Sequence, residues 1–220
     1  MADRVQDLLK VTRARLAATA DPRAPQVREF ARLAYRELKL WPVAERDRFV
    51  TELWKSGVLE EGSVVCYVYR RFAKSCDKRE FAMFEQWVDR YVKEWGHCDG
   101  VSTWLIAASI ANRPELLARL ARWTKSKNRW KRRAAAVSLI YEAKRGRGTE
   151  TIFQICGLLR HDKDDLVRKG VGWLLKETYP KRQRETLRFL DDWRQSAPRL
   201  VLRLAAEKMT TQHREWLLKA

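Results

Sequence analysis

The segment WGHCDGVSTW, residues 95–104, places one acid between two tryptophans in a chain that is otherwise strongly basic. Asp99 lies four residues after Trp95. On a surface that binds an anion, a carboxylate is repelled by the ligand unless it faces a developing positive charge, activates a water or pairs with an arginine. Asp99 is therefore a candidate catalytic residue. The competing interpretation, favoured by the residues alone, is that Asp99 caps a helix over residues 100–112, since Asp is a preferred N-cap residue.

Histidine and cysteine offer no competing chemistry. The four cysteines contain no C-x-x-C pair and have no zinc-like spacing to the three histidines, so we expect reduced thiols and neither a metal nor a cofactor. His97 could titrate near neutrality and assist Asp99. A lone histidine in a turn is more often a bystander, and that interpretation is the favoured one.

The charge of the chain indicates a polyanionic partner. Its 46 Lys and Arg against 28 Asp and Glu give a net charge of +18, which favours nucleic acid over an anionic membrane surface. Residues 125–147 alone contain nine Lys or Arg and one acid, Glu142. Such a block can be a merely solvated face. Because the block flanks a helix with an apolar side, we favour the interpretation that the fold holds these charges in place. Charges held in this way can displace counterions from phosphates.

Tryptophan is also abundant, with ten residues in 220. Most should lie in the core. Trp95 comes just before the candidate acid, and Trp130 and Trp173 lie in basic segments. An indole that faces the basic surface would offer a flat, electron-rich face to a cationic or sugar-like ligand.

The elements that position these residues are predicted to be helices. Apolar residues recur at steps of three and four, as in residues 79–95, and no run alternates with a period of two. Three segments align so that Arg133, Lys169 and Arg203 coincide, at offsets of 36 and 34 residues. This period is typical of stacked helical pairs. The sequence therefore predicts an all-α, curved solenoid of HEAT-like repeats with a concave basic groove.

The length fits one domain over residues 1–220. No apolar run approaches the roughly 18 residues needed to span a membrane, and the N-terminus does not have the pattern of a signal peptide. We expect a soluble monomer in a bacterial-type cytoplasm, associated with the nucleoid and not with membranes.

The C-terminal two-thirds of the chain resembles the AlkD-like DNA alkylation repair glycosylases, which are built from HEAT-like repeats. The resemblance is carried by WGHCD (95–99), NRWKRRAAA (128–136) and VRKGVGWLLKE (167–177), and ELWKS (52–56) looks like an earlier repeat. Residues 39–49 depart from the family pattern. We therefore expect divergent helices over about 1–75 and family-like catalytic repeats over about 76–220.

The resemblance implies a monofunctional enzyme that hydrolyses the N-glycosidic bond of N3- or N7-alkylated purines in duplex DNA, without a cofactor. It implies that Asp99 is catalytic, that Trp95 and Trp173 line the site around the sugar, and that Arg133 contacts the DNA backbone. Further DNA contacts are expected from Lys127, Arg129, Trp130, Lys131, Arg132 and Lys169.

Two other functions stay open. One is a non-catalytic repeat protein that binds damaged or unusually shaped DNA; retention of Asp99, Trp95, Arg133 and Trp173 together argues against it. The other is a protein–protein scaffold of HEAT type, which would leave the charge of +18 unexplained.

Overall fold

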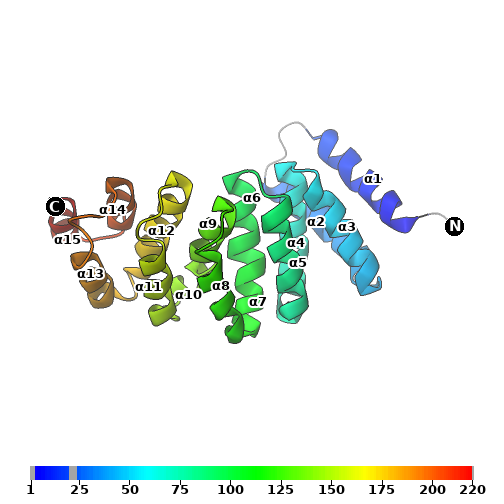
Figure 1. Cartoon of the computed structure of the whole chain (residues 1–220). Coiled ribbons are helices and arrows are strands. Elements are labelled where there is room, and N and C mark those ends of the chain that lie inside the picture. The colour runs from blue at the N-terminus through cyan, green and yellow to red at the C-terminus, as the bar shows by residue number, and fades with distance from the viewer. Residues whose placement is uncertain (1–2, 20–23, 220) are drawn as a thin grey trace. The chain divides into compact units, whose positions relative to one another are not determined.

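The computed structural model describes residues 3–19 and 24–219, and the regular elements in these ranges are all helices (Figure 1). The predicted all-α class is confirmed. The chain divides into two compact units, residues 1–112 and 113–220, where the sequence suggested one domain. Each unit packs a core of its own. Within the described ranges, no helix is both long and apolar enough to cross a membrane.

Unit 1 is a series of helices in which α2, α4 and the α6–η2 segment pack side by side. Its core is aromatic: the rings of Trp54 and Trp87 stack at 5.1 Å, and Tyr69 meets Phe84 edge-on. The side chains of Asp77 and Glu80 form a capping box at the start of α5, the helix Lys78–Arg90. The helices are α1 (Arg4–Ala17), α2 (Ala24–Leu38), α3 (Val43–Lys55), α4 (Leu59–Phe72), η1 (Ala73–Ser75), α5 (Lys78–Arg90), α6 (Trp95–Gly100), η2 (Val101–Ile106) and α7 (Ala107–Asn112).

Unit 2 contains the repeats that the sequence predicted. Helix α12 packs between α9 and α14, and these three helices hold the aligned residues Arg133, Lys169 and Arg203. Asn128 and Asp164 cap the starts of α9 and α12. The elements are η3 (Pro114–Leu116), α8 (Leu117–Trp123), α9 (Arg129–Val137), α10 (Ile140–Lys144), α11 (Thr149–Leu158), α12 (Asp165–Thr178), α13 (Gln183–Asp191), α14 (Arg199–Ala206) and α15 (Thr211–Leu218).

Two glycines allow α12 to lie close to both neighbours. A Cβ on Gly172 would come within 2.7 Å of the Leu204 Cβ of α14, and a Cβ on Gly170 would lie 3.4 Å from the Arg133 Cγ of α9. A Cβ on Gly172 would push α12 and α14 apart, whereas a Cβ on Gly170 would reach ordinary van der Waals contact with α9. The GVG sequence before Trp173 is therefore a packing feature of the repeat.

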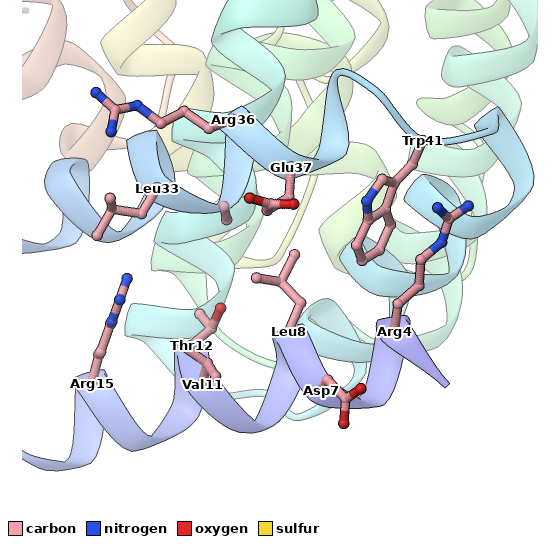
Figure 2. A pocket seen from close by; sticks show the side chains of 11 residues that line it. Arg4, Asp7, Leu8, Val11, Thr12, Arg15, Leu33, Arg36, Glu37 and Trp41 are labelled. Atoms are coloured by element: carbon pink, nitrogen blue, oxygen red, sulfur yellow. The ribbon is translucent and has the colours of Figure 1, made fainter. Parts of the chain in front are cut away.

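A cleft of about 470 Å³ opens between α1 and α2 (Figure 2). Leu8, Leu33 and Trp41 form apolar walls, and Arg15 and Arg36 lie at one end. None of the residues that the sequence predicted for the active site lines this cleft. A smaller hollow of about 130 Å³ lies between α4 and the α6–η2 segment, where Gly96 and Gly100 line it and Asp99 does not.

Candidate active site

Asp99 does not cap a helix. Helix α6 begins at Trp95 with Glu94 as its N-cap residue, so Asp99 is the fifth residue of the helix. The capping interpretation favoured by the residues alone is therefore wrong. The helical chain continues through η2 and α7, so Asp99 sits in the first part of a longer helical segment, where its carboxylate is not needed to satisfy the backbone of a helix start.

A π-helix, η2, begins at Val101, two residues after Asp99. The hydroxyl groups of Ser102 and Thr103 donate to the carbonyl oxygens of Cys98 and Asp99, at 2.6 and 2.7 Å. Such bonds supply donors for carbonyls in a distorted helical turn. Short π segments inside α-helices occur frequently at functional sites. The geometry is thus consistent with a site at Asp99, which lies in α-helix just before the π segment.

Glycines hold α6 tightly against α4. A Cβ on Gly62 would lie 2.7 Å from the His97 ring, and a Cβ on Gly96 would lie 3.1 Å from Leu59. A Cβ on Gly100 would lie 3.2 Å from the Cys66 sulfur, whose thiol has a pKa raised to about 12 by burial. Cys66 therefore acts as a small apolar residue here and not as a nucleophile.

His97 anchors the start of α6. The side chain is buried, its Nε2 lies 3.2 Å from the Val58 carbonyl oxygen and donates to it, and its ring centre is 5.3 Å from that of Trp54. Its Nδ1 lies 3.6 Å from the Glu94 carboxylate. These contacts give His97 a structural role and support the bystander interpretation over assistance to Asp99.

Gly62→Ala tests this anchor. The added methyl group would overlap the His97 ring, and both groups are buried, so we expect a loss of about 1–3 kcal/mol of unfolding free energy. Urea unfolding followed by circular dichroism measures it. Gly157→Ala is the control, because its Cβ would meet nothing within 4 Å. Equal stability of Gly62→Ala and the wild type would contradict the close contact.

Trp95 is the most exposed tryptophan near the acid. Its exposed fraction is 61%, which is large for an indole, and it precedes the half-buried Asp99 by about one helical turn. Residues four apart lie on the same side of a helix. Helix α6 therefore presents an indole and a carboxylate together, and the indole is not part of the core.

Arg133 is placed differently from the expectation. Its side chain is only 5% exposed, packs over Gly170 and donates to the Leu166 carbonyl oxygen at the start of α12. This burial argues against an extended phosphate contact by Arg133. Its guanidinium instead fixes α9 against α12, which makes Arg133 a positioning residue in unit 2.

Trp173 lies one turn beyond Gly170 on α12 and is half-buried. Its indole nitrogen donates to Glu177, 3.3 Å away, and Lys208 donates to the other Glu177 oxygen at 2.5 Å. Burial raises the pKa of Glu177, but the hydrogen bond from Lys208 and the charge of Lys144 outweigh it and hold this pKa below its usual value. An ionised Glu177 thus orients Trp173. The i,i+4 spacing of Trp173 and Glu177 is a signal that sequence reasoning missed.

The predicted DNA-binding residues divide into two groups. Trp130 is only 7% exposed, so it is a core residue and the expected DNA contact of its ring is not supported. Arg132 is engaged by Asp162 and by the carbonyls of Ser126 and Lys127. Lys127, Arg129 and Lys169 are exposed, and Lys131 is half-buried.

Arg129 and Lys131 are nevertheless held in place. Arg129 lies 5.1 Å from the Trp130 ring centre and 3.4 Å from Asp164, and the Lys131 ammonium lies 5.7 Å from the Trp123 ring. Residues 113–220 contain 27 of the 46 Lys and Arg but only 12 of the 28 Asp and Glu. The positive charge of the chain is therefore concentrated in unit 2.

Within the part of the chain that the structure describes, no group of three or more His, Cys, Asp or Glu could hold a metal ion. The four cysteines are free and buried.

Comparison with known proteins places these features in one family. The family model described as DNA alkylation repair enzyme matches residues 22–209. This match begins well before the C-terminal two-thirds on which the resemblance rested, and it includes the helices from α2 to α14. No curated protein matches the chain.

Two solved structures share the fold. A protein of Enterococcus faecalis, described as a predicted DNA alkylation repair enzyme, has a TM-score of 0.76 at 14% identity, and the match covers 86% of this chain and 87% of that one. The protein smu.31 of Streptococcus mutans UA159 has a TM-score of 0.53 at 17% identity, with 94% and 96% covered.

Proposed function

The chain belongs to the DNA alkylation repair enzyme family, and on that premise we propose that it is a monofunctional DNA glycosylase. Its substrates would be N3- or N7-alkylated purines in duplex DNA, and its product an abasic site. The observation that carries the proposal is the placement of Asp99: the carboxylate lies within a helix, beside an exposed indole, in a position that no helix cap requires.

The chemistry follows from the charge of the damaged base. An alkylated purine is cationic, so when its bond to the sugar C1′ breaks, the base takes the bonding electron pair and leaves neutral. The positive charge moves to the sugar, where a carboxylate stabilises it. Asp99 would face this sugar, orient a water toward C1′ and accept the proton that the water loses.

The indoles would act on the same charge. Trp95 and Trp173 would lie beside the deoxyribose, where cation–π attraction grows as positive charge develops and contributes about 0.5–2 kcal/mol for each favourable contact. Interactions that strengthen toward the transition state raise the rate. Glu177 would keep the Trp173 ring in one orientation, because it accepts the indole N–H.

The remaining residues would hold the DNA. Arg133 would position α9 and α12, while Lys127, Arg129, Lys131 and Lys169 would contact phosphates of the duplex. Such contacts carry no base preference. The choice of lesion would therefore come from the charge of the base and from the surroundings of Asp99.

Release of the free base is the direct test. A duplex oligonucleotide with a single N7-methylguanine is incubated with the wild-type protein, and the released base is identified by chromatography. We expect release well above the spontaneous rate, and an intact strand that breaks at the lesion only after treatment with alkali. Binding of this duplex without base release would favour the non-catalytic alternative. If the protein neither bound the duplex nor released the base, the proposal would be overturned.

A further inference from the structure

Two aromatic rings in contact, each with an arginine over it, lie on unit 1, outside the residues that the proposed function uses. The group consists of Arg28 on α2, Tyr67 and Arg70 on α4, and Trp104 on η2, and we call it the arginine–aromatic stripe. The Arg28 guanidinium lies 5.6 Å from the Tyr67 ring centre, and the Arg70 guanidinium lies 4.3 Å from that of Trp104. The two rings meet edge to face at 5.2 Å. The four side chains therefore form one connected surface across three helices.

The stripe borders the hollow between α4 and the α6–η2 segment. Tyr67 and Trp104 line the hollow that also contains Gly96 and Gly100, and Gly100 directly follows Asp99. Both rings are half-buried and both arginines are exposed. The stripe therefore lies against the helical segment that carries Asp99, on its α4 side.

The two arginines are held by rings and not by acids. Among residues 3–19 and 24–219, no carboxylate forms an ion pair with Arg28 or Arg70. Other arginines of the same unit, Arg4, Arg13 and Arg79, pair with carboxylates instead. Stacking on a ring leaves the N–H groups at the edge of a guanidinium available to an anion.

We propose that the arginine–aromatic stripe binds phosphates of the DNA backbone beside the lesion, on the α2 and α4 side of Asp99. The proposal rests on the proposed function, because it extends the DNA contact of that site into unit 1. The nature of the surface selects the ligand: each ring already carries a guanidinium over it, so the stripe offers N–H donors to phosphate oxygens and not open ring faces to bases. Binding here is therefore independent of sequence and sensitive to salt.

The test compares two double variants that remove the same charge. Arg28→Gln with Arg70→Gln removes the stripe, and Arg36→Gln with Arg90→Gln removes two exposed arginines of unit 1 outside it. Affinity for an undamaged 20-base-pair duplex is measured by fluorescence anisotropy at several salt concentrations. For the stripe variant we expect weaker binding, by about tenfold, and a salt slope reduced by about 2, one unit for each lost phosphate contact. The control variant should retain most of the wild-type slope.

A third variant and a second ligand complete the test. Arg28→Lys with Arg70→Lys keeps the charge but loses the planar group that stacks, so its affinity should fall between those of the wild type and the Gln variant. A wild-type salt slope in the Gln variant, or equal losses in the Gln variant and its control, would overturn the proposal. A loss of affinity for single-stranded DNA with no loss of affinity for the duplex would also overturn it, because it would mean that bases stack on the rings. Base release does not enter these measurements, so a failed glycosylase assay and a failed stripe can be told apart.

Discussion

Asp99→Asn should lower the rate of base release by about 100-fold or more, while the affinity for undamaged duplex stays close to that of the wild type. The amide keeps the size of the side chain but loses the negative charge that would stabilise the cationic sugar and accept the proton of the water. Affinity should be retained because a carboxylate makes no favourable contact with phosphates. The rate is measured under single-turnover conditions, with enzyme in excess over a duplex that carries N7-methylguanine.

The control for this variant lies on the same helix. Glu94→Gln removes an exposed carboxylate at the N-cap of α6, where the Glu94 side chain forms no capping hydrogen bond. Its rate should stay within a few-fold of that of the wild type. If Asp99→Asn released the base as fast as the wild type, Asp99 would not be part of the mechanism. If both variants lost the same fraction of the rate of base release, the rate would depend on the negative potential around α6 and not on one carboxylate.

The helical class and the repeats were accessible from sequence because they depend on local periodicity. Apolar residues at steps of three and four predict a helix whatever it packs against. The alignment of Arg133 with Lys169 and Arg203 found three equivalent helices, and the structure packs α9, α12 and α14 next to one another. Those predictions needed no knowledge of distant contacts.

The start of α6 could not be predicted in the same way. The sequence favoured Asp99 as a cap, but the helix begins four residues earlier, at Trp95. The reason lies in another helix: His97 bonds to the Val58 carbonyl and fits against Gly62, so α4 determines where α6 can begin. A contact between residues nearly 40 positions apart overrides the local preference of Asp for a cap.

The burial of residues in the basic segment could not be predicted from the sequence either. Arg133 and Trp130 belong to a strongly basic segment; the resemblance to the family implies a contact of Arg133 with the DNA backbone, and Trp130 is among the further DNA contacts expected. The structure buries both, and it buries Arg133 where α12 lies against α9 with Gly170 at the point of contact. Charge in a sequence shows that a surface is basic, but packing decides which of its arginines reach the ligand.

Gly172→Ala should destabilise unit 2 by about 1–3 kcal/mol, because α12 and α14 touch at this position. The new Cβ would lie 2.7 Å from the Leu204 Cβ and 3.1 Å from the Val201 carbonyl oxygen. The second of these atoms is backbone, which cannot move away by a change of rotamer. The helices must separate instead, and the buried contacts of Leu174 and Leu202 loosen with them.

Hydrogen exchange read by mass spectrometry measures the effect and locates it. Amides of α12 and α14 should exchange faster in Gly172→Ala, whereas amides of residues 24–112 should be unchanged. Gly157→Ala is the matched control in unit 2: it lies on α11 with nothing near its Cβ, so replacing the flexible glycine should stabilise the helix by about 0.5–1 kcal/mol. The same substitution then has opposite signs at two helical glycines of one unit. Protection of α14 in Gly172→Ala equal to that of the wild type would mean that the helices are not held at this distance.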